Sequence, residues 1–395
     1  MHDTERAQLE ALFARNEPFL TPPVTLKALG LTVNLRAESL KLLGWLKAYM
    51  DPVYREEDHS PERVAYDIDY MYADDVVQYA TWMLEAFGAD QSVLRTPSSR
   101  VLMLALGPSS YLLVEPVAGL VYMVDWKARY IKAAYSSKTR WPSKALGSLM
   151  VEVLTRYLEG IGYCNYHAGA FTSPRGAVIV CGKGGSGKTT LLSAAVMAGA
   201  ELIANERCFI KVDESGVHAV GFPQKVFVGL GMALNFEGLR RYALNPSTLL
   251  GPQRRYNFAR VQGTAPEKVG RLGDKFGMLT AEFSAALNGS KPALGGHVVG
   301  IVQPRISSKV ASSTLEPMTH DEQFKLMRRN TISLGRDKHN AFWLDLDFHG
   351  ATPHHEALAK LPGATMHYRI KNQAFVGLDD PLTTIYDMLQ PRMAP

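Results

Sequence analysis

The sequence predicts a mixed α/β fold with two domains, an α+β domain over residues 1–140 and a second domain over 141–395 built on a mixed β-sheet. Short β-rich runs separated by turn residues fill residues 101–124, a pattern typical of an antiparallel meander. Farther on, an apolar strand run at 177–181 leads through a glycine-rich loop into an apolar helix. The chain then returns as a hairpin instead of another helix and parallel strand, which indicates a mixed sheet.

The composition limits the class of protein. With 395 residues, 46% hydrophobic and 21% charged, the chain has the make-up of an ordinary globular protein with room for two cores. Residues 1–16 carry charges every few positions, and no stretch reaches about 18 uninterrupted apolar residues, so neither a signal peptide nor a membrane span is expected. Three cysteines, Cys164, Cys181 and Cys208, are too few for a disulfide framework. We therefore expect a cytoplasmic protein with no membrane contact.

The first domain has clear elements but no chemical motif. Apolar spacing of three and four residues predicts three helices, at 4–14, 39–50 and 74–87. The β-rich runs at 101–106, 111–114 and 120–124 are split by Gly-Pro-Ser-Ser and Pro-Val-Ala-Gly turns. The sequence gives this domain no function of its own.

The second domain begins with an amphipathic helix at 144–158. After the strand at 177–181, a helix at 189–198 and a short strand at 201–204 are expected. The runs at 208–212 and 217–220 flank Asp-Glu-Ser-Gly and predict the hairpin. Later elements are expected as strands at 298–303 and 341–346 and a closing helix at 381–389.

The glycine-rich loop carries the clearest chemistry. Gly182-Lys183-Gly184-Gly185-Ser186-Gly187-Lys188-Thr189 fits the phosphate-loop pattern G-x-x-x-x-G-K-[ST], and Thr190 extends the binding segment. The glycines let successive N–H groups point at a β-phosphate, and the following helix adds its positive end. Lys188 would reach the β- and γ-phosphates, and the Thr189 hydroxyl would ligate Mg²⁺. ATP with Mg²⁺ is the expected ligand; GTP remains open, although no Asn-Lys-x-Asp motif is present.

Other polar residues suggest the reaction. Glu206 follows the strand after the loop helix, so its carboxylate could hold Mg²⁺ or take a proton from an alcohol; a solvent-facing loop glutamate is the alternative. Asn205 could add an amide oxygen to the Mg²⁺ shell. His167 precedes the loop strand, where a lone histidine is more often structural. Asp345 and Asp347 could bind metal, but their alternation is more typical of an edge strand, and a helix start explains three further histidines, His349, His354 and His355.

Together these features resemble the catalytic domain of the HPr kinase/phosphorylase family over about residues 140–230. His167 precedes Gly182 by 15 positions and Glu206 follows Lys188 by 18, as in that family's layout. The resemblance implies a mixed sheet related to phosphoenolpyruvate carboxykinase, a homo-oligomer, and a His167 that helps stabilise the transferring phosphoryl group. The family's tandem aspartates appear here as Asn205-Glu206. Asn205 cannot act as a base, so Glu206 would have to, and reverse phosphorolysis is less expected.

The expected function is transfer of the γ-phosphate of ATP to an alcohol of a peptide, protein or small molecule, with the N-terminal domain helping to select the acceptor. The segment 240–275 holds eight cations against two acids, which indicates either a solvated loop or a basic arm that meets phosphate. Its interleaved Tyr242, Tyr256 and Phe258 also admit a nucleic-acid acceptor. The alternative class is a nucleotide-binding or nucleotide-hydrolysing switch module. The candidates for a cation near the γ-phosphate are Arg254 and Arg255 of the basic segment, with Arg328, Arg329 and Arg336 as rivals.

Overall fold

The computed structural model describes residues 2–54, 64–89, 91–96, 99–222, 224–247, 249–250, 256, 258, 274–287, 289, 291–306, 314–332 and 366–372. Its contacts divide the chain into two compact units. The described residues of unit 1 lie in Met1–Met50 and Tyr54–Ile161, and those of unit 2 lie in Asp51–Val53, Gly162–Ile332 and 366–372. Both units combine helices with a mixed sheet, so the chain belongs to the mixed α/β class.

The boundary between the units falls later than the sequence analysis placed it. The helix α4 (Pro142–Gly160), assigned there to the second domain, belongs to unit 1. Its two ends are tied to the sheet region of that unit: the Tyr157 hydroxyl donates to the Leu29 carbonyl at 2.8 Å, and the Tyr70 hydroxyl donates to the Pro142 carbonyl at 2.8 Å. Long-range packing, which a local pattern does not reveal, explains the difference.

Unit 1 is built on an eight-stranded sheet. Its order is β1 (Val24–Ala28), β2 (Leu31–Ala37), β3 (Val64–Tyr72), β8 (Tyr130–Tyr135), β7 (Leu120–Asp125), β6 (Ser110–Glu115), β5 (Ser99–Ala105) and β4 (Gln91–Thr96). The pairs β2–β3 and β3–β8 are parallel and the remaining pairs are antiparallel. The expected meander is confirmed as β5–β6–β7, in which Leu113 lies opposite Met103 on one side and Tyr122 on the other.

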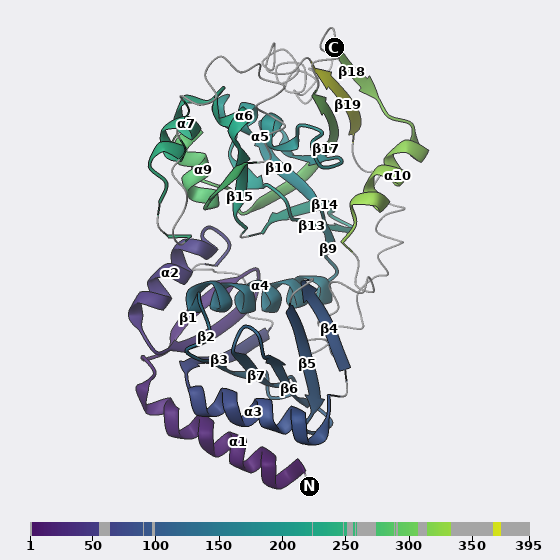
Figure 1. Cartoon of the computed structure of the whole chain (residues 1–395). Helices are drawn as coiled ribbons and strands as arrows, with labels where there is room; N and C mark the ends of the chain where they lie inside the picture. Colours follow the sequence, from purple (N-terminus) through teal and green to yellow (C-terminus); the bar gives the residue numbers. More distant parts are fainter. Residues whose placement is uncertain are drawn as a thin grey trace. The chain divides into compact units, whose positions relative to one another are not determined.

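Helices cover both faces of this sheet (Figure 1). On one face, α1 (His2–Asn16) and α3 (Asp74–Phe87) bury Leu9, Phe13 and Met83 in a single apolar cluster with the sheet. On the other face α4 packs against α2 (Leu40–Met50). All four helices lie where the sequence predicted them, and α2, α3 and α4 each carry an apolar face at helical spacing.

Unit 2 is built on a nine-stranded mixed sheet. Its main path runs β12 (Leu202–Ala204), β10 (Ala168–Ser173), β11 (Gly176–Cys181), β17 (Gly295–Ile306), β14 (Gly216–Gly221), β13 (Cys208–Asp213) and β9 (Cys164–Tyr166). Beside β17 lies β19 (Met366–Asn372), which also pairs with β18 (Thr314–Pro317), and a separate two-stranded sheet joins β15 (Val226–Gly229) to β16 (Lys275–Met278). The predicted hairpin is confirmed as β13–β14. The strands β11, β17 and β19 are mutually parallel, so their carboxyl ends point to one edge.

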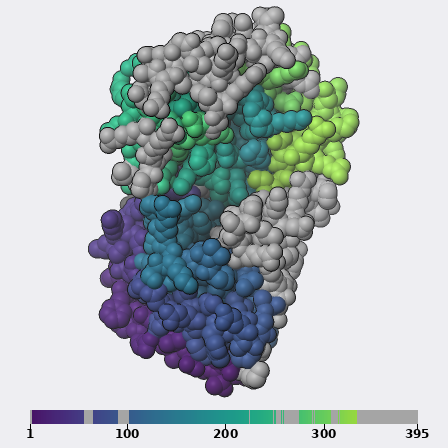
Figure 2. All heavy atoms as spheres, in the orientation of Figure 1, coloured from purple at the N-terminus to yellow at the C-terminus, as the bar shows by residue number. Residues whose placement is uncertain are grey.

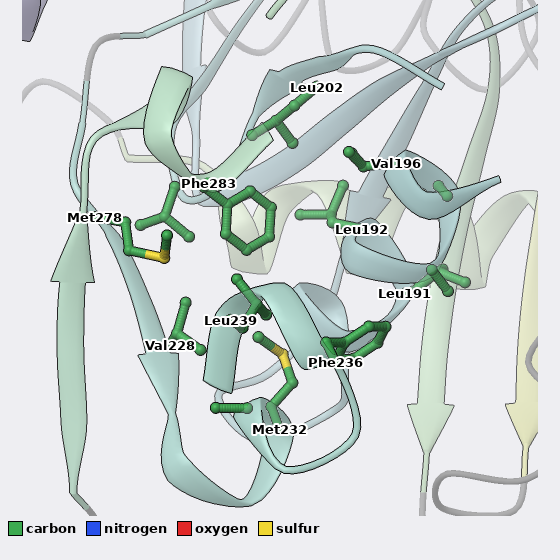
Figure 3. Close-up of a cluster of buried hydrophobic side chains, with 14 of the residues drawn as sticks. Leu191, Leu192, Val196, Leu202, Val228, Met232, Phe236, Leu239, Met278 and Phe283 are labelled. Carbon is green, nitrogen blue, oxygen red and sulfur yellow. The ribbon is translucent and has the colours of Figure 1, made fainter. Parts of the chain in front are cut away.

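The side chains of β11 alternate between two cores. Val178 and Val180 join a cluster with the helices α5 (Lys188–Met197), α6 (Leu230–Ala233), α7 (Glu237–Leu244) and α9 (Thr280–Leu287). In that cluster Leu192, Leu239, Met278 and Phe283 converge from different elements (Figure 3). Ile179 and Cys181 join the other cluster, which includes Leu326 and Met327 of α10 (His320–Asn330). The loop after β11 therefore stands on a strand that is packed on both faces.

Some expectations concern residues outside the described ranges: the strand at 341–346 with Asp345 and Asp347, the three histidines His349, His354 and His355, and the helix at 381–389. The three cysteines are buried and form no disulfide, as expected of small core residues. Within the described residues, no helix has the length and apolarity needed to cross a membrane.

Candidate functional site

The glycine-rich loop joins the end of β11 directly to the start of α5, as the sequence predicts. Gly185 and Gly187 have φ angles of 76° and 100°, in the left-handed region that favours glycine. A Cβ on Gly187 would also lie 2.6 Å from Cγ1 of Ile306, so only glycine fits there. As the N-cap of α5, Gly187 has no side chain to bond the first-turn N–H groups. Those donors are suited to an anion such as phosphate.

Lys188 is held inside the loop. Only 8% of the residue is exposed, and its Nζ donates to the carbonyl of Gly182 at 2.8 Å and to that of Lys183 at 3.4 Å. The same Nζ lies 3.3 Å from Nε2 of His167. Burial lowers the pKa of the Lys188 ammonium, while the nearby Cys181 and Glu206 act in the opposite direction. The lysine thus reaches the edge of the sheet at the place where the loop begins.

His167 lies where the chain passes from β9, paired with β13, to β10, paired with β11 and β12. Its backbone N–H donates to the Asn330 carbonyl at 2.7 Å, which fixes this corner against the end of α10. Burial, followed by the positive charge of Lys188, lowers the pKa of the imidazole. The ring is therefore neutral at neutral pH, and its Nε2 can accept a hydrogen bond from the Lys188 ammonium.

Asn205 and Glu206 occupy a second corner, between β12 and β13. Asn205 is 5% exposed, and within the described structure neither polar atom of its amide has a hydrogen-bond partner. Glu206 is half-buried, and its negative charge opposes the lowering of the pKa of both His167 and Lys188. The carboxylate therefore acts on both residues, although it lies 18 positions beyond the lysine in sequence.

A bound triphosphate and Mg²⁺ agree with these observations. Among the described residues, the amide oxygen of Asn205 and the buried hydroxyl of Ser186 have no hydrogen-bond partner, and both are oxygens of the kind that a hard cation or a phosphate needs. Thr189 is the second residue of α5. Among the described side chains, no three His, Cys, Asp or Glu residues form a metal-binding group. A cation here would thus depend on amide, hydroxyl and phosphate oxygens together with Glu206.

A cavity of about 420 Å³ adjoins the start of the loop. One wall consists of His167, Gly182, Lys183 and Gly184, with Gln303 from the carboxyl end of β17. The opposite wall is α10 and the residue before its cap, which contribute Met318, Glu322, Lys325, Leu326, Arg329 and Asn330. The sequence analysis missed this helix as part of the site.

A local signal for α10 was present in the sequence. Thr319 and Glu322 form a capping box in which the Glu322 N–H donates to Thr319 Oγ1 at 3.3 Å and the Thr319 N–H donates to Glu322 Oε2 at 3.0 Å. Of the five arginines proposed from sequence, Arg329 lines the cavity and Arg328 does not. Arg254, Arg255 and Arg336 lie outside the described residues.

The basic segment 240–275 is only partly described. Its first cations, Arg240 and Arg241, lie on α7, where Arg241 pairs with Glu237 at 2.8 Å. Its three aromatic residues, Tyr242, Tyr256 and Phe258, pack into or against the apolar cluster of Figure 3. Phe258 is buried in this cluster, whereas Tyr242 and Tyr256 are only partly buried against it, and a nucleic-acid acceptor stays a prediction.

The chain was also compared with known proteins. No family model matches it, and no curated protein matches it either. The residues of the site, and the elements that bring them together, are therefore the basis for assigning a function.

Proposed function

We propose that the chain is an ATP-dependent kinase of the HPr kinase/phosphorylase type, acting in the cytoplasm and transferring the γ-phosphoryl group to an alcohol. The proposal rests on one observation: Lys188 contacts His167, and the charge of Glu206 acts on both of them. These groups lie at a glycine loop that leads into a helix without a side-chain N-cap. Three separate segments of the chain supply these groups. A glycine turn with a purely structural role would not require them.

Each group has a role in phosphoryl transfer. The loop N–H groups and Lys188 would bind the β- and γ-phosphates and offset the charge that builds up on the transferring group. The neutral His167, whose hydrogen bond orients the lysine, would stand beside the same phosphoryl group. Mg²⁺, held by oxygens of Thr189 and Asn205, would neutralise charge on the β- and γ-phosphates.

Glu206 would act as the base. Its carboxylate takes the proton of the acceptor hydroxyl as the alcohol oxygen bonds to the γ-phosphorus and the bond to the β-phosphate oxygen breaks. The products are the phosphate ester and ADP. Because Asn205 replaces a second acid, the reverse reaction lacks one carboxylate, and a homo-oligomer is proposed from the family resemblance alone.

The test is transfer of label from γ-labelled ATP with Mg²⁺ to separate pools of peptides, metabolites and nucleic acids. Label should appear on an alcohol in one pool. Lys188→Ala should abolish the transfer, and Glu206→Gln should lower its rate about 10²- to 10⁴-fold, because loss of a general base costs that much. Glu201→Gln, which changes an exposed glutamate of the same region, is the matched control and should leave the rate unchanged.

One observation favours a second candidate, a nucleotide-driven switch module. The acid pair of the kinase family is reduced here to a single carboxylate beside an amide, which retains a metal ligand but lowers the number of bases. Release of free phosphate with no labelled acceptor, unchanged by Glu206→Gln, would support the switch and contradict the kinase.

A further inference from the structure

The cavity beside the loop adjoins the place where the γ-phosphate belongs. Nζ of Lys188 contacts the Gly182 carbonyl at 2.8 Å and lies 3.3 Å from Nε2 of His167, and both of these residues line the cavity. The lysine of a phosphate loop reaches the β- and γ-phosphates. The cavity therefore lies next to the groups that would hold the γ-phosphate, and its volume of about 420 Å³ is that of a small-molecule pocket.

Positive charge dominates the walls of this cavity. Lys183, Lys325 and Arg329 face it, against a single carboxylate, Glu322. That carboxylate caps its own helix by accepting from the Thr319 backbone at 3.0 Å. Lys325 pairs with Asp321 at 2.6 Å. For Lys183 and Arg329, the described part of the chain supplies no carboxylate partner.

The helix α10, which carries two of these cations, is anchored in the core of unit 2. Leu326 and Met327 are buried on the inner side of the helix, and the Asn330 side chain donates to the Leu326 carbonyl at 2.8 Å. The Asn330 carbonyl in turn accepts from His167 N–H at 2.7 Å, which ties α10 to the catalytic corner. The outer side of α10 is exposed on the surface of unit 2, shown in yellow-green in Figure 2. Arg329 is thus an exposed cation on a helix whose inner side is packed in the core.

We propose that this cavity binds the acceptor as an anion, a small hydroxy compound that carries a carboxylate or phosphate group. The negative group pairs with Arg329, whose planar guanidinium suits bidentate contact with either anion, and Lys183 and Lys325 add a favourable field. The hydroxyl of the compound then faces the phosphate loop. This inference rests on the proposed kinase function and names its substrate class.

The first test measures binding to the full-length protein loaded with a non-hydrolysable ATP analogue. Glycerate, glycerol 3-phosphate and neutral glycerol are titrated by calorimetry. At least one of the two anions should bind about tenfold or more tightly than glycerol. Arg329→Gln should weaken binding of that anion about 10- to 100-fold, the effect of losing a charged hydrogen bond, and leave the affinity for the ATP analogue unchanged. Arg328→Gln, one position earlier and outside the cavity, is the matched control.

A charge reversal gives the test a positive readout. Arg329→Glu should invert the order of affinity, so that ethanolamine, a cationic hydroxy compound, binds more tightly than glycerate. Because Arg329 is exposed, neither substitution is expected to affect folding.

Several results would overturn the inference. The wild type could bind glycerol and both anions with equal affinity, or could bind neither anion. The anions could also compete with the ATP analogue, or Arg329→Gln could weaken binding of the nucleotide and not of the anion. Label transfer only to neutral polyols or to serine peptides would also overturn it while leaving the kinase proposal intact. Conversely, Arg329-dependent anion binding without any label transfer would reject the kinase and retain an anion site.

Discussion

At the scale of single residues, Nζ of Lys188 and Nε2 of His167 lie 3.3 Å apart, so the two side chains would repel each other if both were cations. The imidazole stays neutral, because burial and the neighbouring ammonium both lower the pKa of His167 below the ordinary 6.5. The unfolded chain therefore binds a proton that the folded chain does not, over the pH range just below 6.5. His167 should stabilise the fold fully above that range and lose this contribution as the pH falls through it.

The first prediction follows from this loss of stability at low pH. His167→Gln keeps a hydrogen-bonding side chain but cannot become a cation, so the variant should lose less stability than the wild type when the pH falls from about 7.5 to about 5. Urea denaturation of both proteins at several pH values measures the difference in their free energies of unfolding. His218→Gln, at a partly exposed histidine of the β14 strand, serves as the control. A pH dependence that is the same for His167→Gln and wild type would contradict the proposed neutral imidazole.

Residues of the site could be predicted where their signal is local. The loop from Gly182 to Thr189 is contiguous, so its pattern alone places it between a strand and a helix. The approach of Lys188 to His167 crosses 21 positions and depends on β10 pairing with β11. In the sequence analysis, only the family resemblance linked His167 to the phosphate site. Arg329 was only a rival to Arg254 and Arg255, because nothing near it in sequence tells which arginine lines the cavity.

At the scale of elements, α10 links the core of unit 2 to the cavity, and its start is defined by the Thr319–Glu322 capping box. Thr319→Ala removes the side-chain acceptor for the Glu322 N–H and should lower the free energy of unfolding by about 1 kcal/mol. Thr319→Ser keeps the oxygen and should lie near wild type. Urea denaturation compares the three proteins.

The same substitution should affect the proposed acceptor site, because a frayed first turn frees the Glu322 carboxylate beside Lys325 and Arg329. Anion binding in the calorimetric experiment should weaken in Thr319→Ala and stay near wild type in Thr319→Ser. Equal stability and equal anion binding in all three proteins would show that the cap does not define this wall.

Helices and strands were predicted well where the spacing of apolar residues is regular. The bounds of α3 agree at both ends with the expected 74–87, because its apolar stripe ends directly at Gly88. The strands β2 and β3 were missed although both are regular. The pair β2–β3 is parallel and joined by a long segment without a turn signal, and the hairpin of β2 with β1 across Leu29 and Gly30 was also missed. In β3, Asp67 and Asp69 also interrupt the apolar run, and Asp69 is buried only because Arg36 and Tyr130 bond to it from neighbouring strands.

At the scale of the whole molecule, the division into two units decides where the chain can be cut. A cut after residue 140, where the sequence placed the boundary, removes α4 from unit 1. The helix packs on α2, and Leu146, Met150, Leu154 and Leu158 are fully buried on it. Burial of four large apolar side chains contributes on the order of 6–12 kcal/mol, which is comparable with the entire stability of a domain.

The fragment of residues 1–161 should therefore unfold cooperatively in urea, whereas the fragment of residues 1–140 should show a broad or absent transition and bind a hydrophobic dye. Tyr157→Phe in the longer fragment gives an intermediate case. It removes only the hydroxyl that bonds the Leu29 carbonyl, so the fragment should lose about 1 kcal/mol and stay cooperative. If the shorter fragment were as cooperative as the longer one, α4 would belong to unit 2, and the boundary expected from the sequence would be the physical one.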